Sequence, residues 1–474
     1  MMGWLSLFAI AASGCLLIYR WPPLGRFEPL WLWRLLMLAL GCAGGLGLGS
    51  CLFFLLLWSG LASRTSIVAL DVGFLLAAAL LWGKRRHESG AQPAASNRVS
   101  AQVWIFRAVS AAVLLLLLSG WRETTRASPH GDWDAFAIWN LRAKFLAGGD
   151  VHWRHAVSPA LCKGHLGAAH PDYPLLLSGL VAQGWMLSGR ADPAIPIAIG
   201  LFFGVALLAL LAGALAALRD ERVGWVGFIL LAGSESFASQ IAAQCADIPL
   251  ACYVLSTSAL LAVAEQKPAR ATLWWAGVFA ALAAWTKNEG LVFFLLALAW
   301  CLWRGFRRFP FPFLAGAAPA LAVVVSFKLF VAPLTVGLFP TTFAEAFGKL
   351  GDPQRAWLIL QAYARALRDL GFWWAHPLVL ALVWLWASGW VEPERRRQLL
   401  VAAMPLGMLA AGFLVYMLTV ADLRWHLSTS VHRVWLQVWP SLLMSLLLAA
   451  HPDRPELAAS RVRAPSRPRN RVRR

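Results

Sequence analysis

Long runs of apolar residues recur along the whole of this sequence, and they limit the folds that it can adopt. Residues 194–217 contain no charged side chain, and residues 113–118 read VLLLLL. About 20 apolar residues are enough for a helix to cross the hydrocarbon core of a bilayer. Because backbone N–H and C=O groups inside lipid must be satisfied within the chain, such runs form helices there. The sequence therefore predicts an all-α polytopic membrane protein.

The composition excludes an ordinary soluble protein. Of the 474 residues, 59% are hydrophobic and only 14% are charged. A soluble domain carries about a quarter of charged residues. The 27 tryptophans fit the aromatic belts that form where helices leave a membrane.

Fourteen segments are candidate membrane spans, and we expect them to form one continuous bundle. They cover residues 4–19, 35–58, 66–83, 102–120, 174–189, 194–217, 223–240, 248–264, 271–284, 288–303, 311–332, 372–390, 399–420 and 434–450.

Basic residues orient the chain, because loops on the cytoplasmic side of a membrane carry an excess of Lys and Arg. Basic clusters lie at residues 83–87, 219–222, 265–270, 303–309 and 392–397 and in the C-terminal tail, and all are expected in the cytoplasm. The segments expected outside are then 121–173, 241–247, 287–290, 333–371 and 421–433.

This alternation contains one candidate span too many. Residues 174–189, 194–217 and 223–240 lie between two segments that should both be outside. The first of these is the shortest, and it carries Gln183 within its run. We expect residues 174–189 to be re-entrant, interfacial or an incomplete crossing. The chain would then cross the membrane about 13 times, with its N-terminus outside.

The net charge of +19 and the pI of about 10.6 have two interpretations. One is the positive-inside bias of a membrane protein, and the other is nucleic-acid binding. Because the tail follows a membrane bundle, we interpret residues 451–474 as a disordered basic cytoplasmic tail on anionic lipid and expect no nucleic-acid partner. Little Lys with much Arg, Ala and Leu is typical of a GC-rich bacterium, so the expected location is a bacterial cytoplasmic (inner) membrane.

The predicted organisation has four parts. Residues 1–101 are extra N-terminal transmembrane helices with a cytoplasmic loop, and residues 102–303 are a core that includes the outside loop 121–173. Residues 304–450 are C-terminal transmembrane helices with the outside loop 333–371, and residues 451–474 are the tail. Periodic apolar residues in 333–371 predict one or two extracytoplasmic amphipathic helices on the membrane surface. Gly41, Gly45 and Gly49 have the spacing of a helix contact face.

Two carboxylates stand just where the chain leaves a membrane-length run. They are Asp132 and Asp134 in HGDWDAFAIWN, residues 130–140. Asp134 precedes a helical pattern, and an aspartate there caps backbone N–H groups and stays ionised. Alternatively, Asp134 accepts a proton from a hydroxyl at the bilayer surface, or shares a divalent metal with Asp132. The pair alone does not decide between these roles.

Four motifs resemble those of the membrane-embedded GT-C glycosyltransferases, in particular the family-39-like group of protein mannosyltransferases and aminoarabinose transferases. They are DWDAFAIWNLRAKFLAGGD (132–150), HPDYPLLL (170–177), ADIPLACYVL (246–255) and WTKNEGLVFFLL (285–296). The family's acidic pair is an adjacent Asp-Glu, whereas Trp133 separates the two aspartates here. By its distance to GGD, Asp134 matches the family's leading acidic residue. The chain also has extra spans before the pattern and no large soluble C-terminal domain.

The resemblance implies a GT-C-like bundle and a reaction. Such enzymes pass a sugar from a polyprenyl-phosphate donor to a lipid, glycan or protein acceptor on the extracytoplasmic face, with inversion. An inverting displacement needs a base beside the acceptor hydroxyl and cations at the leaving phosphate. Asp134 is the expected base. Asp132 is expected to orient the acceptor or to share a possible divalent metal.

The candidate cations lie in two places. Lys287, with Asn288 and Glu289, is either an ionisable cluster at membrane depth or a solvated turn. The segment 421–433 is either a phosphate clamp or a wet loop at headgroup level. The polar residues of this segment are Arg424, His426, His432 and Arg433.

The remaining substrate-binding candidates are His170, Asp172, Tyr173 and Asp247. Asp247 alternatively caps the helix that it begins. A zinc site at His152, His155, His165 and His170 has only weak support from spacing.

Two other functions suit the same class of protein: a transporter or flippase of lipid-linked sugars, and a non-catalytic membrane assembly factor. Transporters often show internal repeats and helices broken at the midplane. Here the polar clusters fall at one face of the predicted bundle, which favours chemistry at a surface.

Overall fold

The computed structural model describes residues 2–83, 100–149, 152–162, 169–305, 310–334, 339–372 and 374–451. These residues form eighteen α-helices with short 3-10 and π turns between them, and the only β pairing among them is an isolated bridge from Trp390 to Ala450. The predicted all-α fold is therefore confirmed for this part of the chain. The basic residues at 84–87 and 306–309 and the tail after residue 451 lie outside the described residues.

Eight helices in the described ranges are long and apolar enough to cross a membrane, by length and composition. They are α1 (Met2–Arg20), α2 (Leu30–Trp58), α3 (Arg64–Gly83), α4 (Ala101–Ala127), α7 (Ala194–Leu218), α10 (Asp247–Gln266), α13 (Pro310–Phe330), and α17 (Ala403–Leu418) with the turn before it. They are consistent with a multi-pass membrane protein. The number of about 13 crossings stays a prediction.

The other helices are shorter or less apolar. They are α5 (Asn140–Ala147), α6 (Leu176–Ser188), α8 (Glu221–Ala232), α9 (Glu235–Ala242), α11 (Arg270–Thr286), α12 (Asn288–Gly305), α14 (Phe343–Leu350), α15 (Pro353–Arg368), α16 (Pro377–Ser388) and α18 (Leu423–Leu448).

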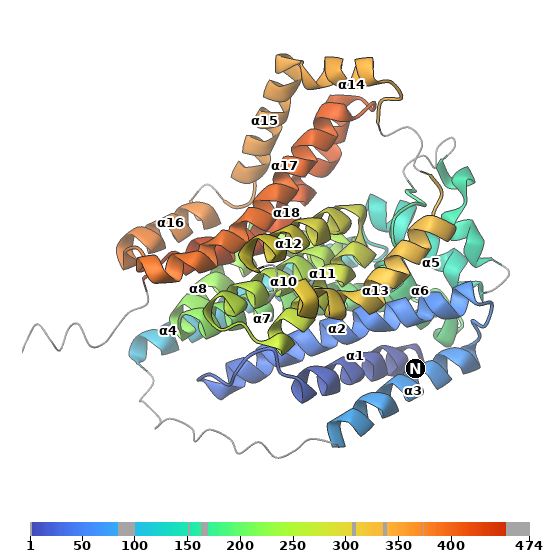
Figure 1. Ribbon diagram of the computed structural model, residues 1–474, viewed down its shortest axis with the longest axis horizontal. Helices are drawn as coiled ribbons and strands as arrows, with labels where there is room; N and C mark the ends of the chain where they lie inside the picture. The colour runs from blue at the N-terminus through green and yellow to red at the C-terminus, as the bar shows by residue number, and fades with distance from the viewer. Residues whose placement is uncertain are drawn as a thin grey trace, which may run out of the picture.

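The bundle is built around α10. In α10, 94% of the most apolar window is buried by other helices, against 17% in α4. Figure 1 shows α1, α2 and α3 along one flank, and α14 and α15 projecting from the bundle beside α17. By this measure α10 lies in the interior and α4 at the periphery. A helix that is apolar on all sides is stable when other helices surround it or when it lies in lipid.

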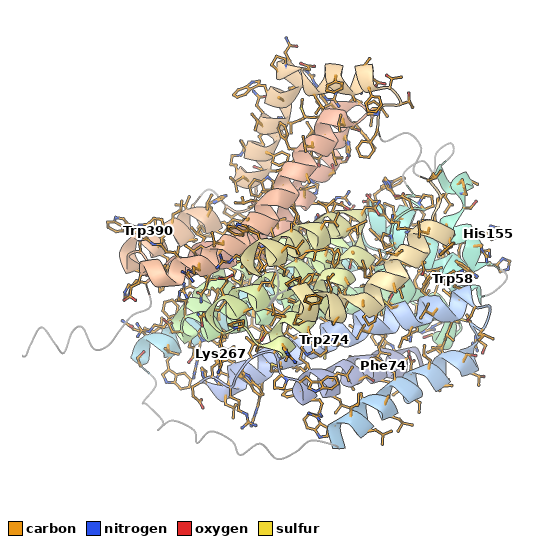
Figure 2. The ribbon with its side chains drawn as sticks, in the orientation of Figure 1. Trp58, Phe74, His155, Lys267, Trp274 and Trp390 are labelled. Carbon is orange, nitrogen blue, oxygen red and sulfur yellow. The ribbon has the colours of Figure 1, made fainter. Side chains whose placement is uncertain are left out.

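The bundle has two ends, which Figure 2 separates. We call the loop end the one that carries residues 128–149 and 152–162, where His155 and Trp58 lie. We call the basic end the opposite one, where α10 ends and Lys267 lies. The predicted basic clusters 219–222 and 392–397 lie together there, since Arg219 Nη1 donates to Gln398 Oε1.

Glycines let α1 and α2 approach each other closely. A Cβ on Gly14 would lie 2.0 Å from the carbonyl oxygen of Gly41, and one on Gly45 would lie 2.2 Å from that of Ile10. A Cβ on Gly49 would lie 2.8 Å from the Ile10 side chain. The predicted contact face of Gly41, Gly45 and Gly49 is therefore confirmed. Packing of small residues is a main source of helix association in lipid, where water does not drive apolar surfaces together.

The helix α6 runs from the middle of the bundle back to the loop end. Its first residue accepts a hydrogen bond from Ser50 Oγ at 3.0 Å, eight residues inside the end of α2. Its last turn lies against Gly3, whose Cβ would be 2.6 Å from Ser188 Oγ, at the start of α1. A helix of 13 residues is about 20 Å long, which is shorter than the hydrocarbon core. This geometry favours the prediction that residues 174–189 do not complete a crossing.

The predicted span 223–240 is wrong as a single helix. The chain forms α8, then breaks at Gly233 and Ser234, and resumes as α9. Together the two pieces retrace α7, because a Cβ on Gly224 would meet Ala212 and one on Gly200 would meet Ile241. The hydroxyl of Ser234 donates to the carbonyl of Leu230 at the point where α8 ends. Serine competes with the helix backbone in this way.

The predicted loop 421–433 is also wrong, because most of it is helical. The carboxylate of Asp422 accepts from the N–H of Trp425 and starts α18 at Leu423. The polar and β-branched residues of this segment have low helix propensity, so the sequence pattern does not indicate the helix. It forms because α15 and α17 bury Leu427 and Val431 in a shared apolar cluster.

The amphipathic helices predicted in 333–371 are confirmed as α14 and α15. The buried face of α15 packs on α17 and α18 through Ile359, Ala362 and Ala366. No residue of α14 is buried, and Phe343 and Phe347 are exposed. Their contact with a membrane surface stays a prediction.

Replacing Gly14 by leucine should destabilise the bundle by about 1–3 kcal/mol, the usual range for overpacking. The new side chain would collide with backbone of α2 that cannot move independently. Thermal unfolding of the chain in detergent measures the effect. Gly73→Leu is the matched control, because a Cβ at Gly73 meets nothing within 4 Å. Equal melting temperatures for the two variants would contradict the close α1–α2 contact.

Thiol labelling tests the course of α6. Ser128 precedes this segment and Arg190 follows it, and both are exposed. If α6 returns to the loop end, Ser128→Cys and Arg190→Cys react with an impermeant maleimide from the same side of the membrane. Lys267→Cys, at the basic end, should react only after permeabilisation. Labelling of positions 128 and 190 from opposite sides would show that α6 crosses.

Candidate active site

An ion pair between Asp134 and Arg433 joins segments that are far apart in the sequence. Arg433 Nη1 donates to Asp134 Oδ2, and the side chains are 18% and 21% exposed for arginine and aspartate, respectively. Asp134 directly precedes the π turn Ala135–Trp139, and Arg433 projects from the middle of α18. The backbone before Asp134 is held in place, because the N–H of Asp132 donates to the carbonyl of Ala243 at 3.1 Å. A hydrogen bond between two ionised groups is stronger than one between neutral groups, and this pair is only partly buried.

Asp247 lies behind this pair and is 1% exposed. Its Oδ1 accepts from Lys287 Nζ at 3.0 Å and from Gln437 Nε2 at 2.6 Å, and its Oδ2 lies 3.9 Å from Arg433 Nη1. Arg433 and Gln437 are four residues apart on α18 and therefore share a face. Asp247 is the first residue of α10, and its carboxylate binds side chains from the α11–α12 junction and from α18. The interpretation as a simple helix cap does not describe these contacts.

Lys287 sits at the junction of α11 and α12. Its side chain is 6% exposed and also pairs with Glu289 Oε1 at 3.0 Å. Its ammonium lies 5.7 Å from the ring centre of Tyr173, within the range of a cation–π contact. The alternative of a solvated turn is therefore wrong, because the lysine is buried and paired.

A second polar group adjoins Lys287. Asn288 Nδ2 donates to Asp172 Oδ2 at 2.7 Å, and Lys328 Nζ donates to Asn288 Oδ1 at 2.6 Å. Lys328, on α13, also donates to the backbone carbonyl of Asp172 at 2.6 Å. The segment 170–173 is thus tied to two different helix ends.

Arg142 holds the backbone of this segment. It is fully buried in α5, and its guanidinium donates to the carbonyls of Ala156 at 2.9 Å, Tyr173 at 2.7 Å and Pro171 at 3.3 Å. Non-helical backbone at membrane depth must find partners within the protein, and Arg142 supplies three of them. The rings of His170 and Tyr173 stack at 4.6 Å.

Burial sets the charge of these two rings. It lowers the pKa of His170 below its ordinary value, so this imidazole is neutral near pH 7. It raises the pKa of Tyr173, which keeps the phenol protonated. Neither ring adds a charge to the cluster near neutral pH.

Several predicted site residues come together here. They are Asp134, Asp172, Tyr173, Asp247, Lys287, Asn288, Glu289 and Arg433, with His170 against Tyr173. We call this set the acid–base cluster. Among its buried atoms, Arg433 Nε, Asp247 Oδ2 and Glu289 Oε2 have no hydrogen-bond partner. The cluster therefore keeps both donor and acceptor capacity for a ligand.

Four other candidates make no side-chain hydrogen bond or ion pair with the cluster that the structure records. Asp132 turns its carboxylate back to the N–H of Trp133 at 2.7 Å and is exposed. His426 contacts Thr419 and Tyr416, and Arg424 is exposed on the first turn of α18. Arg424 precedes Arg433 by nine residues, or about 13 Å along a helix. His432 follows Val431 on α18 and is exposed beside Arg433.

The structure adds two residues that sequence analysis missed, Gln437 and Lys328. Each is a single strongly polar residue inside an apolar run, LQVW and SFKLF. Such residues inside membrane segments usually face the bundle interior and mark functional positions, so this signal was present.

A metal site has no support in the described part of the chain, where no group of three His, Cys, Asp or Glu side chains is placed to hold an ion. His152 and His155 stack at 6.0 Å, and His165 lies outside the described residues.

Comparison of the chain with family models, curated proteins and solved structures gave no match.

Removing one member of the buried ion pair should destabilise the fold. Lys287→Met should lower the free energy of unfolding by about 3 kcal/mol, because Asp247 loses its main cation inside the protein. Combining it with Asp247→Leu should restore most of this loss, since an apolar pair can replace a buried ion pair. Unfolding in detergent, followed by circular dichroism, measures both changes.

Lys144→Met is the control for this experiment, because Lys144 is exposed. Its effect should stay within about 0.5 kcal/mol, as is usual for surface substitutions. Losses that simply add in the double variant would show that Asp247 and Lys287 do not depend on each other.

Proposed function

We propose that this chain is an integral membrane glycosyltransferase of the GT-C type. It would transfer a sugar from a polyprenyl-phosphate donor to an acceptor hydroxyl at the loop end of the bundle, with inversion. The observation that supports this most is the contact of Asp134 with Arg433 directly in front of Asp247 and Lys287. A carboxylate and two cations within one cluster are the groups that such a displacement needs.

The proposed chemistry assigns the exposed carboxylate to the acceptor. Asp134 accepts the proton of the acceptor hydroxyl while the hydroxyl oxygen bonds to the anomeric carbon of the sugar. The bond from that carbon to the donor phosphate oxygen breaks, and its electron pair leaves with the phosphate. Asp134 suits the role of base because its side chain is reachable, unlike that of Asp247.

The two cations of the cluster suit the leaving phosphate. Arg433 offers a planar fork that matches phosphate oxygens, and Lys287 adds a compact charge beside it. Asp247 touches neither the acceptor nor the phosphate in this proposal, and acts as the positioning residue that holds both cations. Donor phosphate competes with Asp134 for Arg433, so binding of the donor releases the base.

The surroundings of Asp134 suit a lipid-linked donor. Trp133 and Phe136 flank it, and they are 64% and 62% exposed. Their rings lie 6.4 Å apart and form an apolar surface next to the carboxylate. A polyprenyl chain is apolar and can lie on such a surface while its phosphate reaches the cations.

A second candidate function is transport of lipid-linked sugars. The broken pair α8 and α9 and the short α6 favour it, because discontinuous helices often form transport sites. The same cations would bind the lipid phosphate, but no group would need to accept a proton.

Asp134→Asn separates the two functions. Purified chain is incubated with a panel of polyprenyl-phosphate sugars and membrane extract as acceptor, and released polyprenyl phosphate is measured by mass spectrometry. The variant should lose about 10²–10⁴-fold in transfer rate, the range for loss of a general base. Binding of the donor should persist because Arg433 and Lys287 remain.

Glu123→Gln is the matched control, since Glu123 is an exposed carboxylate on the last turns of α4. It should transfer sugar like the unaltered chain. Normal transfer by a well-folded Asp134→Asn protein would remove Asp134 as the base. Movement of the donor across vesicles that is unaffected by Asp134→Asn, without any transfer, would instead support the transporter.

A further inference from the structure

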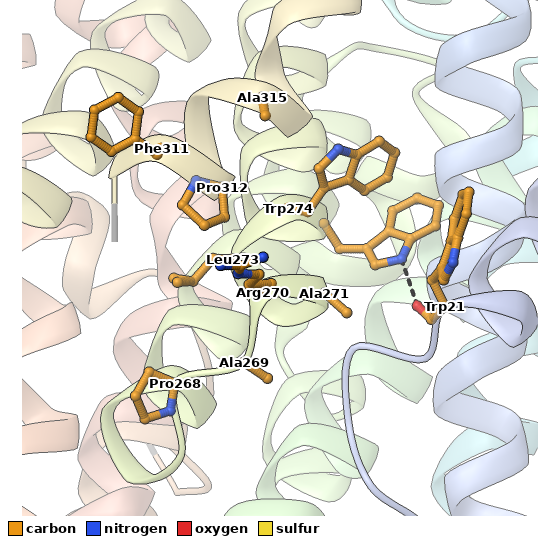
Figure 3. Close-up of a pocket in the computed structure, with 11 residues that line it drawn as sticks. Trp21, Pro268, Ala269, Arg270, Ala271, Leu273, Trp274, Phe311, Pro312 and Ala315 are labelled. Carbon is orange, nitrogen blue, oxygen red and sulfur yellow. Dashed lines mark hydrogen bonds between the residues drawn. The ribbon is translucent and has the colours of Figure 1, made fainter. Parts of the chain in front are cut away.

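A cavity of about 1040 Å³ opens at the basic end of the bundle. It lies between α11, α13 and the segment that joins α1 to α2. Figure 3 shows Trp21, Leu273, Trp274, Phe311 and Ala315 around it, so its walls are largely apolar. Its volume is slightly above the roughly 300–1,000 Å³ that is common for small-molecule pockets.

The cavity wall is part of the folded bundle. The indole N–H of Trp275 donates to the carbonyl of Trp21 at 2.9 Å, the bond that is dashed in Figure 3. The hydroxyl of Thr272 donates to the carbonyl of Pro23. These two bonds fix the connection after α1 against α11. The rings of Trp21 and Trp274 lie 6.4 Å apart and face the same space.

The cavity is distinct from the acid–base cluster. Arg270 lines it at the first residue of α11, and Lys287 follows the last residue of that helix. The 17 residues of α11 span about 25 Å, so the two sites lie at opposite ends of one helix.

The mouth of the cavity is positively charged. Arg270 lines the cavity and is exposed, and Lys267, three residues before it in the chain, is exposed as well. The nearby carboxylate of Glu265 is bound by two N–H groups of Arg304, at 2.7 and 2.8 Å, and therefore does not neutralise Arg270. Ala269, at the start of α11, offers no side chain to cap the first turn, whose N–H groups also favour an anion.

We propose that this cavity binds one anionic phospholipid of the leaflet at the basic end. Its acyl chains lie against Trp21, Trp274 and Leu273, and its phosphate meets Arg270. A soluble phosphate compound would leave the apolar walls unfilled. Phe311, on the rim, is 70% exposed at the end of a membrane-length helix, where a lipid is the available apolar neighbour. The bound lipid packs between the connection after α1, α11 and α13 and holds these three segments together.

Lipid retention tests the proposal. The full chain in detergent is titrated with phosphatidylglycerol, with phosphatidylcholine of the same chain length, or with inorganic phosphate, and bound molecules are counted by native mass spectrometry. Phosphatidylglycerol should bind and raise the melting temperature, and phosphate alone should do neither. Arg270→Ala should bind phosphatidylglycerol about fivefold less tightly, the change for one basic residue near an anionic lipid. Phosphatidylcholine should bind less tightly than phosphatidylglycerol, and Ala315→Trp should fill the cavity and abolish binding of phosphatidylglycerol.

Two control variants carry the same substitutions at positions outside the cavity. Ala318→Trp places the same side chain one turn further along α13, at an exposed position that does not line the cavity, and Arg126→Ala removes an exposed charge at the loop end. Both should retain lipid like the unaltered chain. Equal retention by Ala315→Trp and Ala318→Trp would overturn the proposal. So would competition by inorganic phosphate alone.

Discussion

The buried carboxylate of Asp247 is the contact on which the rest of this structure depends. It brings the start of α10, the junction of α11 and α12, and the middle of α18 to one point, through Lys287, Arg433 and Gln437. An isolated carboxylate in an apolar interior is unstable by many kcal/mol, so these partners are required and not optional. The requirement places Arg433 of α18 beside the segment of Asp134. One buried charge therefore determines the geometry of the acid–base cluster.

Irregular backbone surrounds this cluster, and each irregular piece has its own polar partner. The segment 170–173 is held by Arg142, Asn288 and Lys328. The Asn140 amide donates to Gln244 Oε1, and Gln244 donates to the carbonyl of Pro129. These bonds join residues 129–140 to the turn before α10. Regular helices need no such help, because their backbone groups bond within the helix. The polar side chains that hold this irregular backbone therefore lie next to the cluster, where a polar ligand could bind.

The two proposed sites lie at opposite ends of the bundle. The loop end combines a reachable carboxylate with two cations, which suits chemistry on a lipid phosphate. The basic end combines an apolar cavity with Arg270, which suits a resident lipid. Both sites use the same helix, α11, whose interior from Trp275 to Trp285 is almost fully buried and whose ends carry the charges.

The sequence by itself determined the helical class, the glycine contact face of α1 and α2, and most members of the acid–base cluster, because apolar run length, small-residue spacing and charges at helix ends are local properties. It did not determine that residues 223–240 break or that residues 423–433 are helical. Ser234 and the α15–α17 packing decide those points, and neither acts through neighbouring residues alone. Only the tertiary structure decided that Asp134 meets Arg433, 299 positions away, while Asp132 and Arg424 stay apart. Pairing between distant charges depends on which helix faces meet, and that is decided by the packing of the whole bundle around α10.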